Sequence, residues 1–295
     1  AAALSRLEDA GHAYPCFCTP EALEAQRRAQ AFAGRPPRYD GTCRGLDTRE
    51  RQARRAAGEA STLRFAGPLS GKVAFEDLVH GPRRFECADL GDFVLRRADG
   101  SPSFLFCNAL DDAESGVTHV LRGEDHITNT PRQMQIFRAL GAEPPVYGHM
   151  PLIVGADRAR LSKRHGATSL LAYRDLGFLP GATLNYLARL GWSHGDQEIF
   201  TVPELVAAFD AGAIHKAAAA WDMEKFAWVN AQHLFVEVGQ LLHEVGRAIG
   251  VGVGGRHRVL ALAAEVKPEV PGLAGPALDL VGGVVMPQLA GARLV

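Results

Sequence analysis

The spacing of apolar residues changes along the chain and predicts a mixed part followed by a helical part. In residues 1–33 the apolar positions recur at helical intervals, which predicts two helices, the second beginning at Thr19-Pro20. Asp47-Thr48-Arg49-Glu50 has the pattern of a capping box and predicts a further helix. Beyond about residue 165 the pattern is helical almost throughout, and we expect helices at 168–176, 180–190, 202–212, 223–231 and 233–249.

Between these helices the pattern takes the two-residue period of β-strands. We expect strands at 62–65, 72–75, 92–96, 103–107, 117–122 and 147–154. A helix from 129 to 140 should separate the last two strands, because Pro131 suits a first turn and Gly141 suits a stop. The chain is therefore predicted to be α/β first and all-α afterwards.

The composition is that of an ordinary globular protein. The chain has 295 residues, 47% of them hydrophobic, which is enough for two or more domains with cores. Its formal net charge of -1 argues neither for nor against nucleic-acid binding, because a local basic face can bind phosphates on a neutral protein. No apolar stretch approaches the roughly 20 residues of a membrane helix, so we expect no membrane association. The 5 cysteines are odd in number and unevenly placed, unlike a secreted disulfide framework, so we expect the reducing cytoplasm.

A cationic loop lies between the last predicted strand and the first helix of the all-α part. Residues 155–166 contain Arg158, Arg160, Lys163 and Arg164, with glycines at both ends for flexibility. Lysine is a compact charge, and arginine can hold phosphate oxygens with two parallel hydrogen bonds. Such a loop suits a reaction in which negative charge builds up on phosphorus. Taken alone, the same residues would also fit a solvated basic loop.

The surroundings of the loop resemble glutamyl-tRNA synthetases, which are class I aminoacyl-tRNA synthetases. The resemblance rests on Leu161-Ser162-Lys163-Arg164-His165-Gly166, Leu184-Asn185-Tyr186-Leu187, Leu190-Gly191-Trp192, Thr118-His119-Val120-Leu121-Arg122-Gly123-Glu124-Asp125-His126 and Asn129-Thr130-Pro131-Arg132-Gln133. It covers roughly residues 1–245 and is strong from 90 to 195. In this family the loop is the second signature motif, usually Lys-hydrophobic-Ser-Lys-Arg, so the resemblance implies a catalytic and ATP-binding role for Arg160, Ser162, Lys163 and Arg164. Arg160 stands where the family usually has Lys.

The resemblance also implies a glutamate site. Arg122 and Asn108 would contact the glutamate, and Asp125 would lie near the ribose or adenine of ATP. Phe104 stands where the family often has Tyr, so it would keep the ring at the glutamate site and lose the hydroxyl. We expect a structural or tRNA-facing role for Asp111-Asp112 rather than a metal site, because adjacent strand residues point to opposite faces.

Three cysteines near the start of the chain are candidates for a structural zinc site. Cys16 and Cys18 form a Cys-x-Cys pair and Cys43 follows further on, whereas zinc takes four ligands. Some relatives supply His at the place of Gly45, and the related glutamyl-queuosine enzymes resemble a Tyr-x-x-x-Cys arrangement that would make Tyr39 the fourth ligand. The alternative is that the cysteines are small residues without metal, as in the many family members that lack zinc.

The resemblance implies a fold and a set of domains. The fold would be the second half of a class I Rossmann-like nucleotide fold with an acceptor-end-binding insertion. An all-α stem-contact domain and the start of an α-helical anticodon-binding domain would follow. The expected ranges are 1–101 mainly for the insertion, 102–155 for the nucleotide fold, 156–245 for the signature loop and stem-contact domain, and 246–295 for the truncated anticodon-binding domain.

The implied activity is ligation of L-glutamate to tRNA(Glu) by a monomer, with ATP and Mg²⁺, through a glutamyl-adenylate. The first class I signature, His-Ile-Gly-His, occurs nowhere in the sequence. We therefore expect a fragment that is inactive alone. One alternative is a glutamyl-queuosine-tRNA(Asp) synthetase, but that family lacks the C-terminal helical domains that 168–249 predicts. Glutaminyl-tRNA synthetase has a β-rich C-terminal half, unlike this chain. The remaining alternative is an inactive tRNA-binding remnant.

Overall fold

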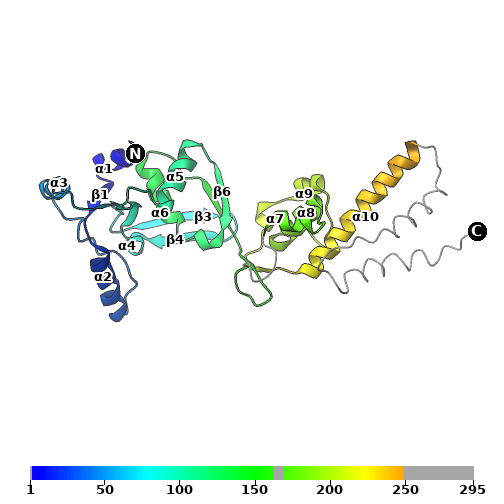
Figure 1. Cartoon of the computed structure of the whole chain (residues 1–295), viewed down its shortest axis with the longest axis horizontal. Coiled ribbons are helices and arrows are strands. Elements are labelled where there is room, and N and C mark those ends of the chain that lie inside the picture. Colours follow the sequence, from blue (N-terminus) through cyan, green and yellow to red (C-terminus); the bar gives the residue numbers. More distant parts are fainter. Residues whose placement is uncertain (1, 162–168, 249–295) are drawn as a thin grey trace, which may run out of the picture. The chain divides into compact units, whose positions relative to one another are not determined.

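The computed structural model describes residues 2–161 and 169–248, and the chain divides into two compact units after Met150 (Figure 1). The first unit, Ala1–Met150, is mixed α/β, and the described part of the second unit, Pro151–Val295, is mainly helical. This order agrees with the predicted change from a mixed pattern to a helical one.

The first unit contains two sheets and their covering helices. Its elements are α1 (Ala2–Asp9), β1 (Ala13–Cys16), α2 (Pro20–Phe32), α3 (Thr48–Ala56), β2 (Thr62–Phe65), β3 (Lys72–Asp77), β4 (Gly81–Glu86), α4 (Cys87–Leu90), β5 (Phe93–Arg96), α5 (Phe104–Glu114), β6 (His119–Gly123), η1 (Glu124–His126), α6 (Thr130–Ala139) and β7 (Val146–Met150). Thr19 and Asp47 cap α2 and α3 through their side chains, as the sequence predicts.

A three-stranded antiparallel sheet has the strand order β1-β2-β5. Leu63 and Leu95 are almost fully buried, and Phe65 stacks on its register partner Phe93 with ring centroids 5.0 Å apart. These residues share one core with apolar side chains of α1, α5 and α6. Burial of this apolar surface is the main stabilising term for this half of the unit.

A four-stranded mixed sheet has the order β4-β3-β7-β6. β3 pairs antiparallel with β4, whereas β7 runs parallel to both β3 and β6. Parallel neighbours need a crossover, and α6 supplies it between β6 and β7. In this register Arg122 lies directly opposite His149, close to the carboxyl end of β6.

Four predicted elements differ from the structure. Residues 103–107, predicted as a strand, begin helix α5, because Ser103 caps it and the buried Phe106 and Ala109 have helical spacing. The aromatic run there imitates a strand pattern. The predicted strand 147–154 is divided between β7 and β8 (Ile153–Val154), and the helices predicted at 223–231 and 233–249 form one helix, α10 (Met223–Ala248).

The described part of the second unit comprises α7 (Leu170–Asp175), α8 (Pro180–Gly191), α9 (Val202–Ala208), η3 (Ala211–Ala213), α10 and the short parallel pair β8 and β9 (Ala219–Ala220). An aromatic core joins α8 to α10: Phe226 lies 4.2 Å from Phe178 and 4.6 Å from Tyr186 between ring centroids. Asn185 is fully buried and joins three segments, since it donates to the carbonyl of Glu198 and accepts from the amide of Phe200 and from His233. Within residues 2–161 and 169–248, no helix has the length and apolarity that crossing a membrane requires.

Candidate functional site

A pocket of about 370 Å³ lies between helix α5 and strand β6 and is lined along the strand from His119 to Arg122. Helix α5 contributes Phe104, Asn108 and Asp112, which share one helix face because they are four residues apart. Strand β6 contributes Arg122 on the other side. Arg122 lies close to the carboxyl end of β6, and α/β sheets typically bind their ligands where parallel strands end.

Arg122 is half-buried and its guanidinium is held by hydrogen bonds on several sides. Its Nε donates to His149 Nε2 at 3.3 Å, its Nη1 to Asn108 Oδ1 at 3.4 Å, and its Nη2 to Thr130 Oγ1 at 2.7 Å. Burial lowers the pKa of Arg122, and the nearby Tyr147 and acidic side chains oppose this shift. Arginine stays protonated even so. These bonds within the described chain use three of its five N–H groups and leave two for a carboxylate ligand.

Asn108 lies beside this guanidinium. Its Oδ1 accepts from Gln133 Nε2 at 2.6 Å as well as from Arg122. Because the oxygen faces two donors, the Nδ2 group of Asn108 is left to donate to a ligand in the pocket. Gln133 is almost fully buried on α6, so the orientation of Asn108 is set from the core side.

Of the other residues expected at the glutamate and ATP sites, Phe104 lines the pocket and Asp125 directly precedes the lining residue His126. Phe104 is 52% exposed, and its ring lies 5.5 Å from the His126 ring. Asp125 is exposed on η1. Asp111 and Asp112 lie on helix α5 and not on a strand, so the alternation argument made for them was wrong. Burial raises the pKa of Asp112, and the positive charge of Arg122 opposes that shift.

The structure describes only the beginning of the predicted signature loop. Ser162, Lys163 and Arg164 lie outside the described residues. Arg160 is exposed and forms an isolated antiparallel bridge with Val154. The amide of Gly155 donates to the carbonyl of Ala159 at 2.8 Å, so β8 is followed by a tight hairpin that leads into the signature residues.

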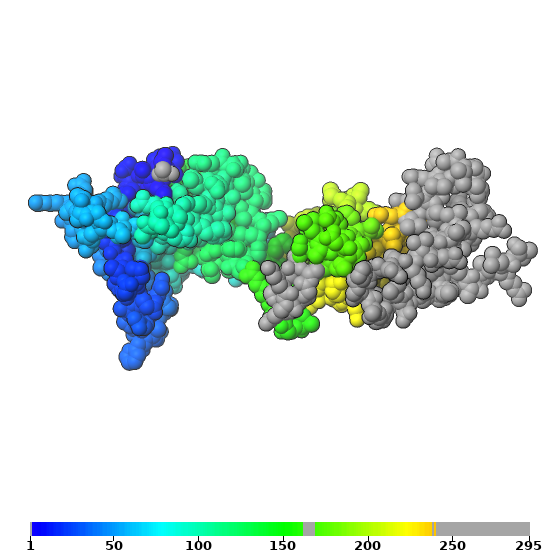
Figure 2. All heavy atoms as spheres, viewed as in Figure 1, coloured from blue at the N-terminus to red at the C-terminus, as the bar shows by residue number. Residues whose placement is uncertain are grey.

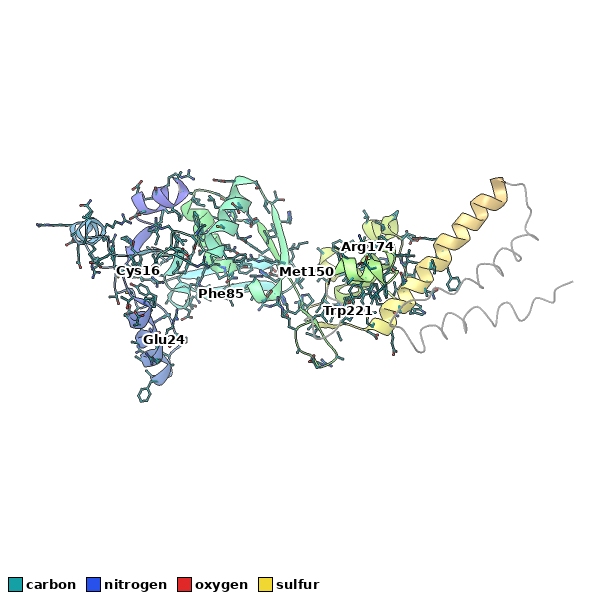
Figure 3. All side chains as sticks on the ribbon, in the orientation of Figure 1. Cys16, Glu24, Phe85, Met150, Arg174 and Trp221 are labelled. Atoms are coloured by element: carbon teal, nitrogen blue, oxygen red, sulfur yellow. The ribbon has the colours of Figure 1, made fainter. Side chains whose placement is uncertain are left out.

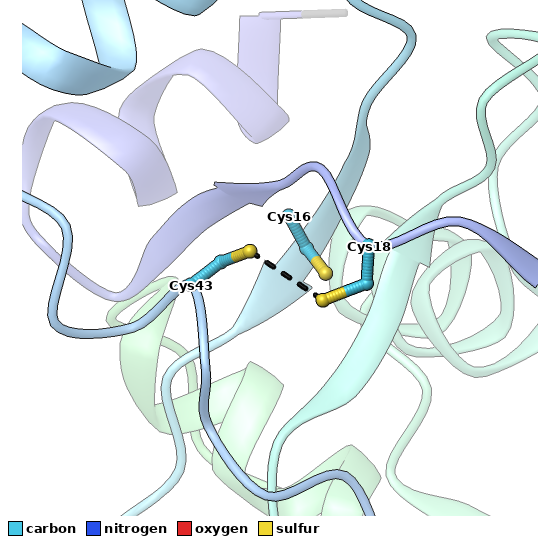
Figure 4. A group of neighbouring side chains, drawn as sticks. All are labelled: Cys16, Cys18 and Cys43. Carbon is cyan, nitrogen blue, oxygen red and sulfur yellow. Dashed lines mark hydrogen bonds between the residues drawn. The ribbon is translucent and has the colours of Figure 1, made fainter. Parts of the chain in front are cut away.

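The three cysteines predicted as candidate zinc ligands lie close together in the first unit, as Figure 4 shows. Their Sγ atoms all lie within 4.8 Å of one another, and Cys18 and Cys43 are 3.6 Å apart. The hydroxyl of Tyr39 lies 3.4 Å from Cys16 Sγ and 3.6 Å from Cys18 Sγ. Ligands of a tetrahedral zinc with Zn–S bonds of ~2.3 Å stand ~3.8 Å apart. Three sulfurs and one phenol oxygen therefore fit the donor set and the spacing of a zinc site.

The surroundings of this thiol cluster favour the thiolate form of Cys16. Burial raises the pKa of Cys16, but hydrogen bonds with Tyr39 and Arg64 outweigh it and lower that pKa to about 7. The thiolate is the form of cysteine that binds metals. Burial and the neighbouring thiols raise the pKa of Cys18 to about 11. The guanidinium of Arg64 is buried and lies 3.9 Å from the centroid of the Tyr39 ring. Figure 3 shows Cys16 near α2 and Met150 at the opposite end of the unit, so the thiol cluster is separate from the pocket at β6.

Sequence reasoning missed Asp77 and His149, which are fully buried behind Arg122. The one available signal was a histidine inside a predicted apolar strand. Asp77 offered no signal, because it is 72 positions from its partner in the sequence.

A βαβ unit whose parallel strand carries a half-buried arginine near its carboxyl end is an arrangement in which α/β proteins bind ligands. The model of the catalytic domain of class I tRNA synthetases (E and Q) matches residues 2–228. The chain belongs to this family. It is 51% identical over 231 residues to glutamate–tRNA ligase 1 of Acidithiobacillus ferrooxidans, and 50% identical over 229 residues to glutamate–tRNA ligase 1 of Alkalilimnicola ehrlichii.

Solved structures give the same family. The chain is 28% identical to a glutamate tRNA ligase from Elizabethkingia meningosepticum solved in complex with its amino acid, with a TM-score of 0.72 over 95% of this chain and 59% of that chain. A glutamate-tRNA synthetase from Elizabethkingia anophelis matches with a TM-score of 0.71 at 28% identity, over 95% of this chain and 60% of that one. The two curated relatives are each matched over 78% of this chain and 48% of their own length, so the chain spans about half the length of the relatives.

Proposed function

We propose that this chain is part of an enzyme that ligates L-glutamate to tRNA(Glu) with ATP. The observation that carries the proposal is Arg122, a half-buried arginine with two N–H groups left for a carboxylate, beside Asn108 in the pocket at β6. The names of the relatives support the same reaction.

The reaction has two steps. A carboxylate oxygen of glutamate attacks the α-phosphate of ATP and pyrophosphate leaves. A ribose hydroxyl at the 3′ end of the tRNA then attacks the glutamyl carbonyl and AMP leaves. Neither step needs a nucleophile from the enzyme, so alignment and stabilisation of phosphate charge supply the catalysis.

We assign roles to the named residues on this basis. Arg122 and Asn108 bind a glutamate carboxylate, and the Phe104 ring covers one side of the substrate. Lys163 is the chief cation on the leaving pyrophosphate, assisted by Arg160, Ser162 and Arg164. Mg²⁺ enters with ATP and neutralises phosphate charge, and Asp125 lies toward the nucleoside part.

We further propose how the tRNA is bound. Residues 1–101 are mainly the insertion that holds the acceptor end. Within the first unit, α2 projects from the body, as the blue segment of Figure 2 shows. Its exposed arginines, Arg27 and Arg28, suit phosphate contacts. Residues 102–155 then supply the nucleotide fold, 156–245 the signature loop and stem contact, and 246–295 the start of anticodon binding.

We propose a structural zinc held by Cys16, Cys18, Cys43 and Tyr39. When bound, the ion would cross-link β1 to the loop that carries Tyr39 and Cys43, which gives this part of the insertion a fixed shape. None of the 5 cysteines, all of which lie among the described residues, forms a disulfide, and we propose that the protein acts in the cytoplasm. We expect it to act as a monomer.

The proposal is tested by L-glutamate binding to the chain, measured by isothermal titration. Arg122→Gln should weaken binding about tenfold to a hundredfold, because a charge-assisted pair is lost. Arg132→Gln is the matched control: Arg132 is a partly buried arginine on α6, but it donates to the backbone carbonyls of Thr128 and Leu90 outside the pocket. Equal binding by wild type and Arg122→Gln would refute the role of Arg122.

The phosphate loop needs a separate test. ATP–pyrophosphate exchange, with glutamate and tRNA added, should be measured on a chain that also carries the first signature segment. Lys163→Ala should abolish exchange there and leave the circular dichroism spectrum unchanged. Undiminished exchange in this variant would contradict the role of Lys163.

A further inference from the structure

Behind the pocket, two fully buried side chains form a hydrogen-bonded pair. Asp77, the last residue of β3, has its Oδ2 2.5 Å from His149 Nδ1 on the neighbouring strand β7. Both side chains are 0% exposed, and neither is among the residues that line the pocket. A fully buried carboxylate is costly to desolvate, so its presence here calls for a reason.

The surroundings of Asp77 determine which ring nitrogen of His149 carries the proton. The carboxylate accepts at Oδ1 from the backbone amides of Val79, His80 and His149, at 2.9–3.3 Å. Burial would raise the pKa of Asp77, but the bonds from His149 and from these amides lower it overall. Asp77 is therefore an ionised acceptor, and His149 must donate to it from Nδ1–H.

The other nitrogen of the same ring then has a free lone pair. Burial lowers the pKa of His149, against the effect of Asp77, so the ring is neutral and Nε2 is an acceptor. The Nε of Arg122 points at this atom from 3.3 Å, and Thr130 Oγ1 lies 3.0 Å from it. Arg122 and His149 are register partners on parallel strands, so their side chains rise from the sheet side by side.

We propose that Asp77 and His149 are positioning residues, which hold the guanidinium of Arg122 in the orientation that presents its two remaining N–H groups to the substrate carboxylate. The inference rests on the function proposed above for Arg122. Asp77 selects the ring tautomer, His149 accepts from Nε–H, and Thr130 accepts from Nη2, so the guanidinium is fixed on the side away from the pocket. Neither Asp77 nor His149 touches the substrate.

Three substitutions test this chain of hydrogen bonds from Asp77 through His149 to Arg122. Asp77→Asn keeps the shape but places an amide N–H against His149 Nδ1, because the three backbone amides hold the oxygen at Oδ1. The ring must then carry its proton on Nε2, where it would face the Nε–H of Arg122. His149→Asn keeps an N–H for Asp77 but has no atom at the Nε2 position. His149→Gln has a terminal amide oxygen at that position and can still accept from Arg122.

The first readout does not depend on glutamate. In ¹⁵N NMR spectra of the chain, His149 should show the Nδ1–H tautomer in wild type and the Nε2–H tautomer in Asp77→Asn. The Nε–H resonance of Arg122 should be protected from solvent exchange in wild type and in His149→Gln, and lose that protection in Asp77→Asn and His149→Asn. An Nε2–H tautomer in wild type would overturn the inference.

The second readout is L-glutamate affinity by isothermal titration. Asp77→Asn and His149→Asn should bind about tenfold to a hundredfold more weakly than wild type, and His149→Gln should recover most of the loss. Folded Asp77→Asn that binds glutamate within twofold of wild type would overturn the inference, and so would a His149→Gln that is as weak as His149→Asn. If wild type itself binds no glutamate, the proposed function fails, and the NMR experiment still decides whether the pair positions Arg122.

Discussion

The side chain of Asp92 joins the parts of the first unit around the thiol cluster, and its removal should lower the free energy of unfolding by a predictable amount. Its carboxylate is 6% exposed and accepts from the Tyr14 hydroxyl at 2.5 Å, from Arg44 Nη1 at 2.8 Å and from the amide of Gly67 at 2.9 Å. Tyr14 lies on β1 two positions before Cys16, and Arg44 directly follows Cys43. Asp92 therefore connects β5 to both segments that supply thiols.

We predict that Asp92→Ala destabilises the first unit by about 3–5 kcal/mol. The Tyr14 hydroxyl is buried, and stranding it together with the Gly67 amide costs ~1–3 kcal/mol each. Arg44 contributes less than a fully buried partner would, because its side chain is 29% exposed and regains water. Asp89→Ala is the control: its side chain is 77% exposed, it lies 3.9 Å from Arg38, and its loss should cost less than ~1 kcal/mol.

The assay can separate the two units. All 3 tryptophans, Trp192, Trp221 and Trp228, lie in the second unit, so tryptophan fluorescence during urea denaturation reports on that unit. Hydrogen exchange of peptides from residues 2–150, followed by mass spectrometry across the same urea series, reports on the first. Asp92→Ala should move the first transition and leave the fluorescence transition in place. If Asp92→Ala lowered the stability of the first unit by less than ~1 kcal/mol, or by no more than Asp89→Ala does, the reasoning would be refuted.

Further predictions concern the metal site and the second unit. Cys43→Ser should abolish zinc retention by the chain, measured by inductively coupled plasma mass spectrometry, and Tyr39→Phe should weaken it, because each variant removes one of the four proposed ligands. Cys107→Ser, which changes a thiol outside the cluster, should leave retention unchanged, and zinc-free wild type would refute the site. Asn185→Ala should lower the stability of the second unit by about 2–4 kcal/mol in the fluorescence assay, since it leaves two buried polar groups and one partly buried carbonyl without their partner. An unchanged denaturation midpoint would contradict this role of Asn185. Burial lowers the pKa of His233, so protonation of this side chain favours the unfolded chain. The stability that depends on neutral His233 should be complete above pH ~6.5 and should fall as the pH drops below that value. His233→Gln should reduce this dependence of stability on pH, and an equal dependence in both proteins would contradict the assignment.

The local elements followed from the sequence because their causes are local. Thr19 and Asp47 cap helices through side-chain acceptors close to the first turn, so short motifs were sufficient to predict both starts. The start of α5 was not predicted. Phe104 and its neighbours have strand propensity, and the burial of Phe106 against α6 and the three-stranded sheet is what makes them helical. A tertiary contact of this kind leaves no mark in a short window of sequence.

The sequence by itself determined the family, and it predicted the phosphate loop and the arginine and cysteines that could hold a carboxylate and a metal. The tertiary structure decided how these groups are held. Tyr39 could be suggested only by resemblance until its hydroxyl was found within 3.4–3.6 Å of two thiols. Asp77 and His149 are 72 positions apart, and they meet because β3 and β7 become parallel neighbours in one sheet. Strand order is set by the burial of whole sheet faces, so the partners of Arg122 became visible only once the sheet had been assembled.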